Sequence, residues 1–171
     1  MESKNEQLWL RAPEPEDLEF MVNMENLEEM MSVGIATGPY SRYQIKQYIA
    51  SNENDIYTDR QVRFVVEHSE YGAVGIVDLF SFDPRAGKVE IGLAVAPDRR
   101  RRGIAAGALR QIENYCFGFL NIHQIYAFIA VDNTACIQLF TQHGYVNKCV
   151  MTDWLCMGLQ YKDVCFMQKI R

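Results

Sequence analysis

The sequence predicts an α/β (α+β mixed-sheet) domain of 171 residues, with helices packed against the sheet. Short runs of β-branched and aromatic residues alternate with amphipathic stretches of helical length. In the middle of the chain, two such runs are joined by a turn that favours an antiparallel hairpin. No repeat, low-complexity tract or linker divides the chain, so residues 1–171 are expected to form one domain.

The first third of the chain is expected to be mainly helical. A short strand at Leu8–Arg11 precedes a helix over 14–31, which has an apolar stripe at helical spacing and an acidic first turn. Residues 32–40 contain two glycines and a proline, which predicts a loop. Ser41 suits the N-cap of a second helix that runs to about Ser51. The residues of that helix expected to face inward are Ile45, Tyr48 and Ile49.

The remaining elements are expected to alternate between strands and helices. Three strands are predicted over 62–66, 75–80 and 88–95, and the turn 83–87 joins the last two as a hairpin. A long helix over 105–119, a strand over 124–131, a helix over 134–143 and two strands within 145–170 complete the order β-α-α-β-β-β-α-β-α-β-β. The expected buried face of the long helix comprises Ala105, Ala108, Leu109, Ile112, Cys116 and Phe119.

Composition excludes several classes of function. The chain has 17 basic and 22 acidic side chains and a net charge of -5, which disfavours a nucleic-acid binder. No apolar run approaches the roughly 18 residues of a membrane span, and the start has no apolar leader, so a cytoplasmic protein is expected. Five cysteines without a CxxC, and three separated histidines, predict reduced thiols and no metal site.

The segment Arg100-Arg101-Arg102-Gly103-Ile104-Ala105 lies between a predicted strand and a predicted helix. A helix N-terminus leaves amide N–H groups unpaired and carries partial positive charge, so it favours phosphate. The glycine lets a ligand approach the backbone closely, and the arginines can pair with phosphate oxygens. A local cationic site in an acidic protein therefore indicates a small anionic ligand.

This segment also fits the Q/R-x-x-G-x-G/A signature of the GNAT N-acetyltransferase superfamily, and the chain resembles that family over nearly its whole length. The end of the chain resembles the ribosomal-protein and spermidine/diamine acetyltransferase branch. The other motifs that carry the resemblance are Leu10–Leu18, Glu90–Pro97, Asn133–Tyr145 and Trp154–Val164.

The resemblance implies a GNAT-like fold and acetyl-CoA as co-substrate. The pyrophosphate of CoA is then expected on Arg100, Arg101, Arg102, Gly103, Ile104 and Ala105. The pantetheine is expected beside Leu93, Ala94 and Val95, extended like an added strand. The residues expected to hold the other side of the cofactor are Asn133, Cys136 and Phe140.

Acetylation of an amine needs a base, because keeping a primary ammonium neutral at pH 7 costs about 4.6 kcal/mol. Glu90 is the candidate, since it lies on the strand expected to carry the cofactor, where the family often places a base; Asp78 on the neighbouring strand is the alternative. Backbone N–H groups near 93–95 could stabilise the oxyanion.

The sequence departs from the family pattern at the residue that would act as the general acid and protonate the departing thiolate. Position 140 often holds a tyrosine in the family, and here Phe140 cannot donate a proton, so we expect it to be a packing wall beside the thiol. Cys136 is expected to be structural, and His143 to lie at a helix C-terminus or on the surface. The conceivable substitutes for the acid are Tyr126, Tyr145 and Tyr161, each expected rather in the core or at an interface.

The amine that accepts the acetyl group is the part of the expected function that the sequence determines least. The family's loop after the first helix commonly borders the acceptor site, which indicates Glu28, Glu29 and Tyr40 as substrate-binding residues. The expected reaction is direct transfer, in a ternary complex, to a primary amine: a polyamine or other small cationic amine, or a protein N-terminus. A non-catalytic CoA-binding sensor or scaffold is the alternative. The resemblance also makes a homodimer through the last strands an expectation.

Overall fold

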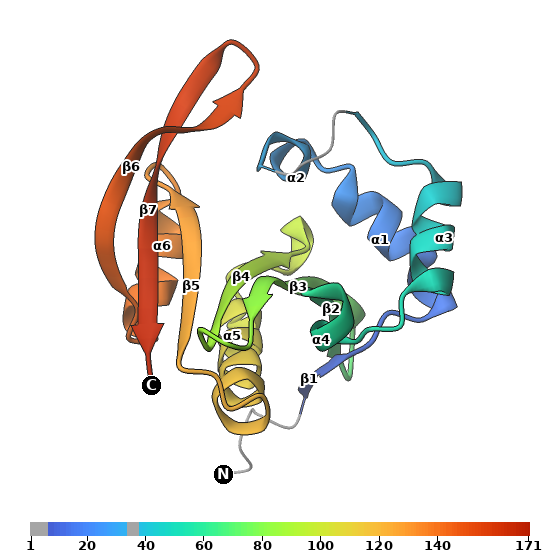
Figure 1. The fold of residues 1–171 in the computed structure, drawn as a ribbon. Coiled ribbons are helices and arrows are strands. Elements are labelled where there is room, and N and C mark those ends of the chain that lie inside the picture. The colour runs from blue at the N-terminus through green and yellow to red at the C-terminus, as the bar shows by residue number, and fades with distance from the viewer. Residues whose placement is uncertain (1–6, 34–37) are drawn as a thin grey trace.

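The computed structural model describes residues 7–33 and 38–171, and its central feature is a seven-stranded sheet in the order β1-β2-β3-β4-β5-β7-β6 (Figure 1). All neighbouring strands are antiparallel except β4 and β5, which are parallel. The predicted mixed sheet, its seven strands and the β3–β4 hairpin are therefore confirmed. The strands are β1 (Leu8–Arg11), β2 (Val62–His68), β3 (Gly72–Asp83), β4 (Lys88–Val95), β5 (Gln124–Ala130), β6 (Val146–Met157) and β7 (Gln160–Ile170).

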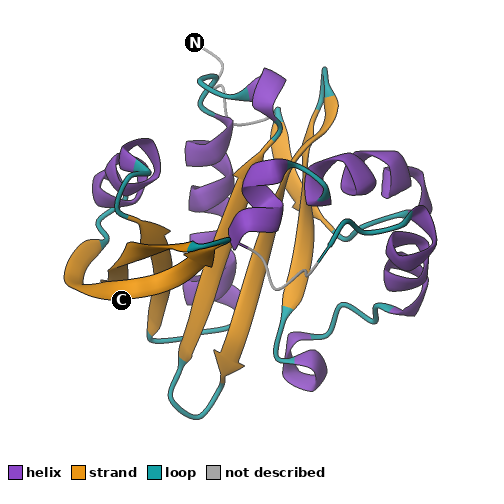
Figure 2. Ribbon diagram, turned by 90° about the horizontal axis from the view of Figure 1, so that it is seen from above, coloured by secondary structure: helices purple, strands orange, loops and turns teal. Residues whose placement is uncertain are grey.

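Helices lie on both sides of the strands (Figure 2). They are α1 (Leu18–Glu25), α2 (Glu28–Val33), α3 (Arg42–Ser51), α4 (Ile56–Asp59), α5 (Ile104–Asn114) and α6 (Thr134–Gln142). Three short turns accompany them: the 3-10 turns η1 (Pro15–Asp17) and η2 (Pro97–Arg99), and the π-helical turn η3 (Tyr115–Phe119). No helix in the described ranges is long and apolar enough to cross a membrane.

The core is divided between the two faces of the sheet, because successive side chains of a strand point to opposite faces. Val77 and Leu79 of β3 join the larger cluster, to which α5 and α6 contribute. Ile76 of the same strand joins a smaller cluster with Met21 of α1 and Ile45 of α3. Ser41 is the N-cap of α3, and Ile45, Tyr48 and Ile49 face inward, as predicted.

The predicted single helix over 14–31 is wrong, because the chain breaks at Asn26 into α1 and α2. The Asn26 side chain accepts a hydrogen bond from the Tyr40 N–H at 2.8 Å and donates one to the Tyr40 carbonyl at 3.0 Å. These bonds attach the junction between α1 and α2 to the segment just before α3, so the junction is fixed by a distant part of the chain. Residues 32 and 33 belong to α2 rather than to the predicted loop, and 34–37 lie outside the described residues.

The long predicted helix over 105–119 is confirmed through Asn114, but the placement of Phe119 in the core is wrong. The last turn, η3, is π-helical, so it holds more residues than an α-helical turn and rotates its final residues away from the 3.6-residue stripe. Phe119 is 78% exposed, while the next residue, Leu120, is buried in its place. The short helix α4, capped by Asp55, was not predicted.

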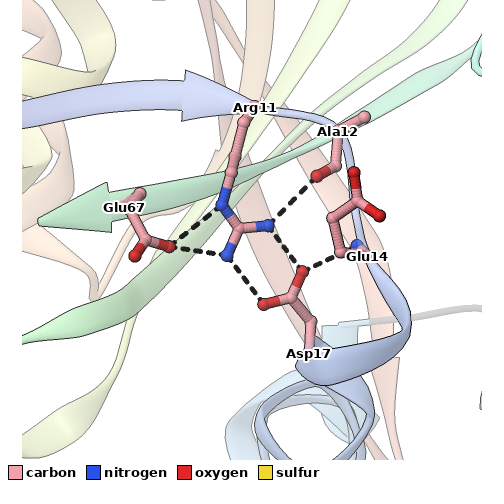
Figure 3. Close-up of polar contacts among 5 residues, drawn as sticks. All are labelled: Arg11, Ala12, Glu14, Asp17 and Glu67. Atoms are coloured by element: carbon pink, nitrogen blue, oxygen red, sulfur yellow. Dashed lines mark hydrogen bonds and ion pairs between the residues drawn. The ribbon is translucent and has the colours of Figure 1, made fainter.

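A cluster of charged side chains attaches the turn η1, which precedes α1, to the sheet (Figure 3). Arg11 of β1 donates to both oxygens of Asp17 at 2.6 and 2.8 Å, and to Glu67 of β2 at 2.6 Å. Burial by itself would raise the pKa of Asp17, but the hydrogen bonds from Arg11 and the Glu14 N–H lower it. This cluster fixes where α1 begins over the sheet.

Candidate active site

The sheet opens in the middle, where β4 and β5 separate. The two parallel strands pair only at Lys88–Gln124, Val89–Ile125 and Glu90–Tyr126, although β4 continues to Val95 and β5 to Ala130. On its other edge β4 stays paired with β3 as far as Val95. Within the described residues, the edge of β4 after Glu90 that faces β5 therefore has no strand partner. An extended ligand can approach backbone groups there as an added strand would.

The arginine segment comes directly after this open edge. Arg101 and Gly103 have positive φ values of 60° and 79°, which turn the chain into α5. Gly103 is the N-cap of α5, and it has no side chain to satisfy the first N–H groups of the helix. A Cβ atom at Gly103 would meet nothing within 4 Å, so the space in front of the helix is open. Exposed N–H groups, an adjoining positive dipole and exposed arginines suit a phosphate group.

The four arginines are not equivalent. Arg100 Nε donates to the Val95 carbonyl at 3.0 Å, and its guanidinium forms an ion pair with Glu29 of α2. Arg99 forms an ion pair with its neighbour Asp98 at 3.2 Å. Arg101 and Arg102 are exposed. Ile104, which was predicted to touch the ligand, has its side chain buried in the core, so its contribution would come from the backbone.

Glu90 occupies the last paired position before β4 and β5 separate. It lies opposite Phe80 of β3 and Tyr126 of β5. The ring of Phe80 also covers Gly92, since a Cβ there would lie 3.0 Å from Phe80 Cε2. Burial between these neighbours raises the pKa of the Glu90 carboxyl. A carboxylate with a raised pKa is a better proton acceptor than an ordinary glutamate.

Asp78, the alternative base, is already engaged. Its two oxygens accept hydrogen bonds from Arg63 of β2 at 2.6 and 2.8 Å. The same guanidinium also pairs with Glu25 of α1. Arg63 and Glu25 were not recognised in the sequence, because no motif signals pairs separated by 15 and 38 positions. These contacts make Glu90 the better candidate.

The three tyrosines considered as acids occupy different environments. Tyr145 is buried against Phe140, with ring centroids 4.7 Å apart, and burial raises its pKa. Tyr161 is exposed on β7. Tyr126 lies beside Glu90, and its pKa is raised by burial and by that neighbouring carboxylate. Tyr126 is therefore the phenol nearest to the candidate base in the sheet.

Helix α6 carries the other three residues expected at the cofactor. Asn133 is its N-cap, and the Asn133 side chain accepts a hydrogen bond from the Cys136 N–H at 3.2 Å. Burial raises the pKa of the Cys136 thiol to about 11, which fits a structural cysteine rather than a nucleophile. Phe140 is buried in the larger core cluster. His143 is the C-cap of α6, as expected for a residue at a helix C-terminus. Its Nδ1 atom lies 3.7 Å from Oε2 of Glu113.

Replacing Asn133 by alanine is expected to lower the free energy of unfolding by about 1 kcal/mol, because the first turn of α6 loses its cap. Asn133→Ser is the matched control, since serine also caps and should cost much less. Urea unfolding of the three proteins measures the difference. Equal stability of Asn133→Ala and the parent would contradict the capping role.

The expected acceptor residues lie on two neighbouring features. Glu28 is exposed on α2, a helix that contacts β6, and Glu29 of the same helix is paired with Arg100. Tyr40 lines a cavity of about 180 Å³ between α1, α3 and the strands β2 and β3. Phe80 connects this cavity with the candidate base, because it lines the cavity and also lies opposite Glu90. Among residues 7–33 and 38–171, no group of three metal-ligating side chains gathers.

The open edge of β4, the uncapped start of α5 and the adjoining arginines fit an extended thiol ester that ends in phosphates. Together with a half-buried carboxylate at the opening, these features suit an acyl-CoA-dependent acyltransferase.

Comparison with known proteins gives the family. The Acetyltransferase (GNAT) domain family matches residues 7–146. The spermidine N(1)-acetyltransferase of Vibrio cholerae serotype O1 is 29% identical over 160 residues, covering 94% of this chain and 91% of its own. A crystal structure of spermidine N-acetyltransferase from Vibrio cholerae with CoA and spermine has a TM-score of 0.85, 29% identity and 96% coverage of both chains. A dodecameric structure of the Vibrio cholerae enzyme in an intermediate state has a TM-score of 0.81, 28% identity and coverages of 96% and 94%.

The chain belongs to the GNAT acetyltransferase family. It is an acetyl-CoA-dependent N-acetyltransferase with the fold of the spermidine acetyltransferases.

Proposed function

We propose that this enzyme transfers the acetyl group to a primary amine of a polyamine, with spermidine as the representative acceptor, by direct transfer in a ternary complex. The position of Glu90 carries the proposal. This half-buried carboxylate lies where β4 and β5 separate, next to the edge proposed for the thioester. Residues 1–171 act as one acetyltransferase domain in this proposal.

Acetyl-CoA supplies the acetyl group as a thioester. Leu93, Ala94 and Val95 would offer their backbone to the pantetheine, and backbone N–H groups of this stretch would stabilise the developing oxyanion. Arg101, Arg102 and the N–H groups after Gly103 would hold the phosphates. Asn133 and Cys136 at the start of α6 would bound the other side of the cofactor, whereas Phe140 is buried in the core and would support this helix from within.

Glu90 would take the proton from the acceptor ammonium, which leaves a neutral amine as the nucleophile. Its raised pKa narrows the difference from the roughly 10.4 of a primary ammonium, so the proton transfer costs less than to an exposed glutamate. The thiol that leaves needs less assistance, because its pKa is only about 8.5. If a side chain protonates it, Tyr126 is our candidate, since Phe140 has no acidic proton.

A polyamine is favoured over other amines by the surroundings of Glu90. A row of aromatic rings extends from Tyr126 along the sheet. Phe128 lies next to Tyr126, and Trp154 of β6 stacks on Phe128 with ring centroids 5.4 Å apart. Ammonium groups and aliphatic chains both bind well to such rings. Glu28 adds an exposed negative charge on α2, which contacts β6. The relatives named above carry spermidine in their names, which supports the same acceptor class.

Thiol release from acetyl-CoA, measured against a panel of amines, tests this proposal. Spermidine and spermine are expected to exceed N-terminal peptides, amino acids and an aminoglycoside by at least about tenfold in kcat/KM, a difference of about 1.4 kcal/mol. Faster turnover with the peptides would assign the acceptor to protein N-termini. Silence across the panel, with CoA still bound in calorimetry, would contradict the polyamine proposal and favour a sensor or scaffold.

We further propose that the protein works in the cytoplasm and associates with copies of itself, and that nucleic acid and membranes are not its partners. The last two strands support self-association, because they expose large apolar side chains. A dodecameric relative supports it as well. The exposed apolar residues of these strands and their turn are Val146, Val150, Trp154, Leu159, Tyr161 and Ile170.

A further inference from the structure

Tyr71 lies in the turn between β2 and β3, and two arginines that precede α5, Arg99 and Arg102, lie over its ring. The Cζ atom of Arg99 is 4.5 Å from the ring centroid, and that of Arg102 is 5.6 Å from it. His68, the last residue of β2, stacks on the same ring at 4.6 Å with an interplanar angle of 21°. Neither the arginine motif nor any other sequence pattern signalled this tyrosine.

The turn holds the ring firmly in place. The Tyr71 N–H donates to the His68 carbonyl at 3.2 Å, and the Glu70 N–H donates to His68 Nδ1 at 3.1 Å. The Ser69 N–H donates to the Gln7 carbonyl at 2.9 Å, which attaches the turn to the chain just before β1. The ring also packs against the larger core cluster. Tyr71 is therefore a fixed surface on which longer side chains can rest.

This surface matters because arginine side chains are long. An unrestrained arginine side chain populates many rotamers, and part of that rotamer entropy is lost when the side chain binds a ligand. A guanidinium that rests on an aromatic ring has lost some of that freedom before the ligand arrives, while its N–H groups still point outward in the guanidinium plane. Restraint before binding raises affinity.

We propose that Tyr71 is a positioning residue for the phosphate groups of CoA, acting through Arg99 and Arg102. The inference rests on the proposed placement of those phosphates at the start of α5. It adds Arg99 to the cofactor-binding residues and makes the β2–β3 turn part of the cofactor site. The ring itself need not touch the ligand.

The test compares CoA dissociation constants of Tyr71→Leu and Tyr71→Phe by calorimetry. Leucine keeps the apolar packing of this half-buried position but has no ring, whereas phenylalanine keeps the ring. Tyr71→Leu is expected to bind CoA about five- to tenfold more weakly, because both arginines then lose their restraint before binding, and Tyr71→Phe within about twofold of the parent. Tyr43→Ala is the matched control: this exposed tyrosine lies on α3 and should not affect CoA binding.

A double-mutant cycle separates positioning from a merely structural role. When Arg99 and Arg102 are both replaced by alanine, adding Tyr71→Leu should cause no further loss of affinity. An equal loss with and without the two arginines would overturn the inference, because the ring would then act independently of them. Unchanged affinity of Tyr71→Leu in the parent would overturn it as well. A parent protein that does not bind CoA would instead overturn the proposed function.

Discussion

Gly103→Glu is expected to raise the dissociation constant for CoA at least about 100-fold, which corresponds to roughly 2.7 kcal/mol. Gly103 has a φ of 79° and caps α5, and a side chain there would extend into the open space in front of the helix. The glutamate would place a negative charge where the phosphates are proposed to bind. It would also strain the backbone by about 1–2 kcal/mol, because left-handed backbone suits few residues other than glycine. Calorimetric titration with CoA measures the effect.

Two control variants isolate the effect of the added negative charge at position 103. Gly103→Asn introduces an uncharged residue that tolerates left-handed backbone and caps helices. It should therefore weaken CoA binding far less than Gly103→Glu does. Gly118→Glu adds the same charge at an exposed glycine of η3 whose Cβ position is also open. It should leave CoA binding unchanged. If Gly103→Glu bound CoA as tightly as the parent, the phosphates could not lie at the start of α5.

Glu90→Gln is expected to lower kcat at least about 100-fold while CoA affinity stays within about twofold of the parent, because glutamine cannot accept the proton of the ammonium. Glu53→Gln is the matched control, since Glu53 is exposed outside the site and its replacement should leave turnover unchanged. Steady-state thiol release and CoA titration together check the result. Full turnover in Glu90→Gln would move the base to another group.

The raised pKa of Glu90 makes a separate prediction about pH. The base works only when ionised, so the rate in the parent should rise with pH through the raised pKa, and Glu90→Gln should lack this dependence. Stability should change in the opposite direction. Between the unfolded pKa and the raised folded pKa, the folded state binds more protons, so stability falls as pH rises through that interval. Above it, the parent carries the full cost of the buried charge, and Glu90→Gln should be at least as stable.

A loss of turnover without a loss of stability would therefore identify Glu90 as functional rather than structural. At Asn133 a loss of stability is expected as well, because its replacement removes the cap of α6. Comparing the two variants shows whether activity and folding can be changed independently in this chain.

The sequence by itself determined the seven strands and the arginine–glycine segment at the start of α5. Alternating apolar residues and turn residues act over a few positions, and a glycine in left-handed backbone before a helix is a local requirement. These features depend on neighbours in the chain, so they can be read along it. Glu90 as the candidate base came from its place in one strand together with the resemblance to the GNAT family.

Only the tertiary structure decided what depends on residues distant in sequence. Asn26, where α1 ends, is bonded to Tyr40, and Asp78 is engaged by Arg63. Tyr71 meets Arg99 because the start of β3 lies beside the end of β4, where Gly75 pairs with Val95. The separation of β4 from β5 after Glu90 is likewise a property of the pair and not of either strand. Contacts of this kind form when the chain packs, and no spacing along one segment encodes them.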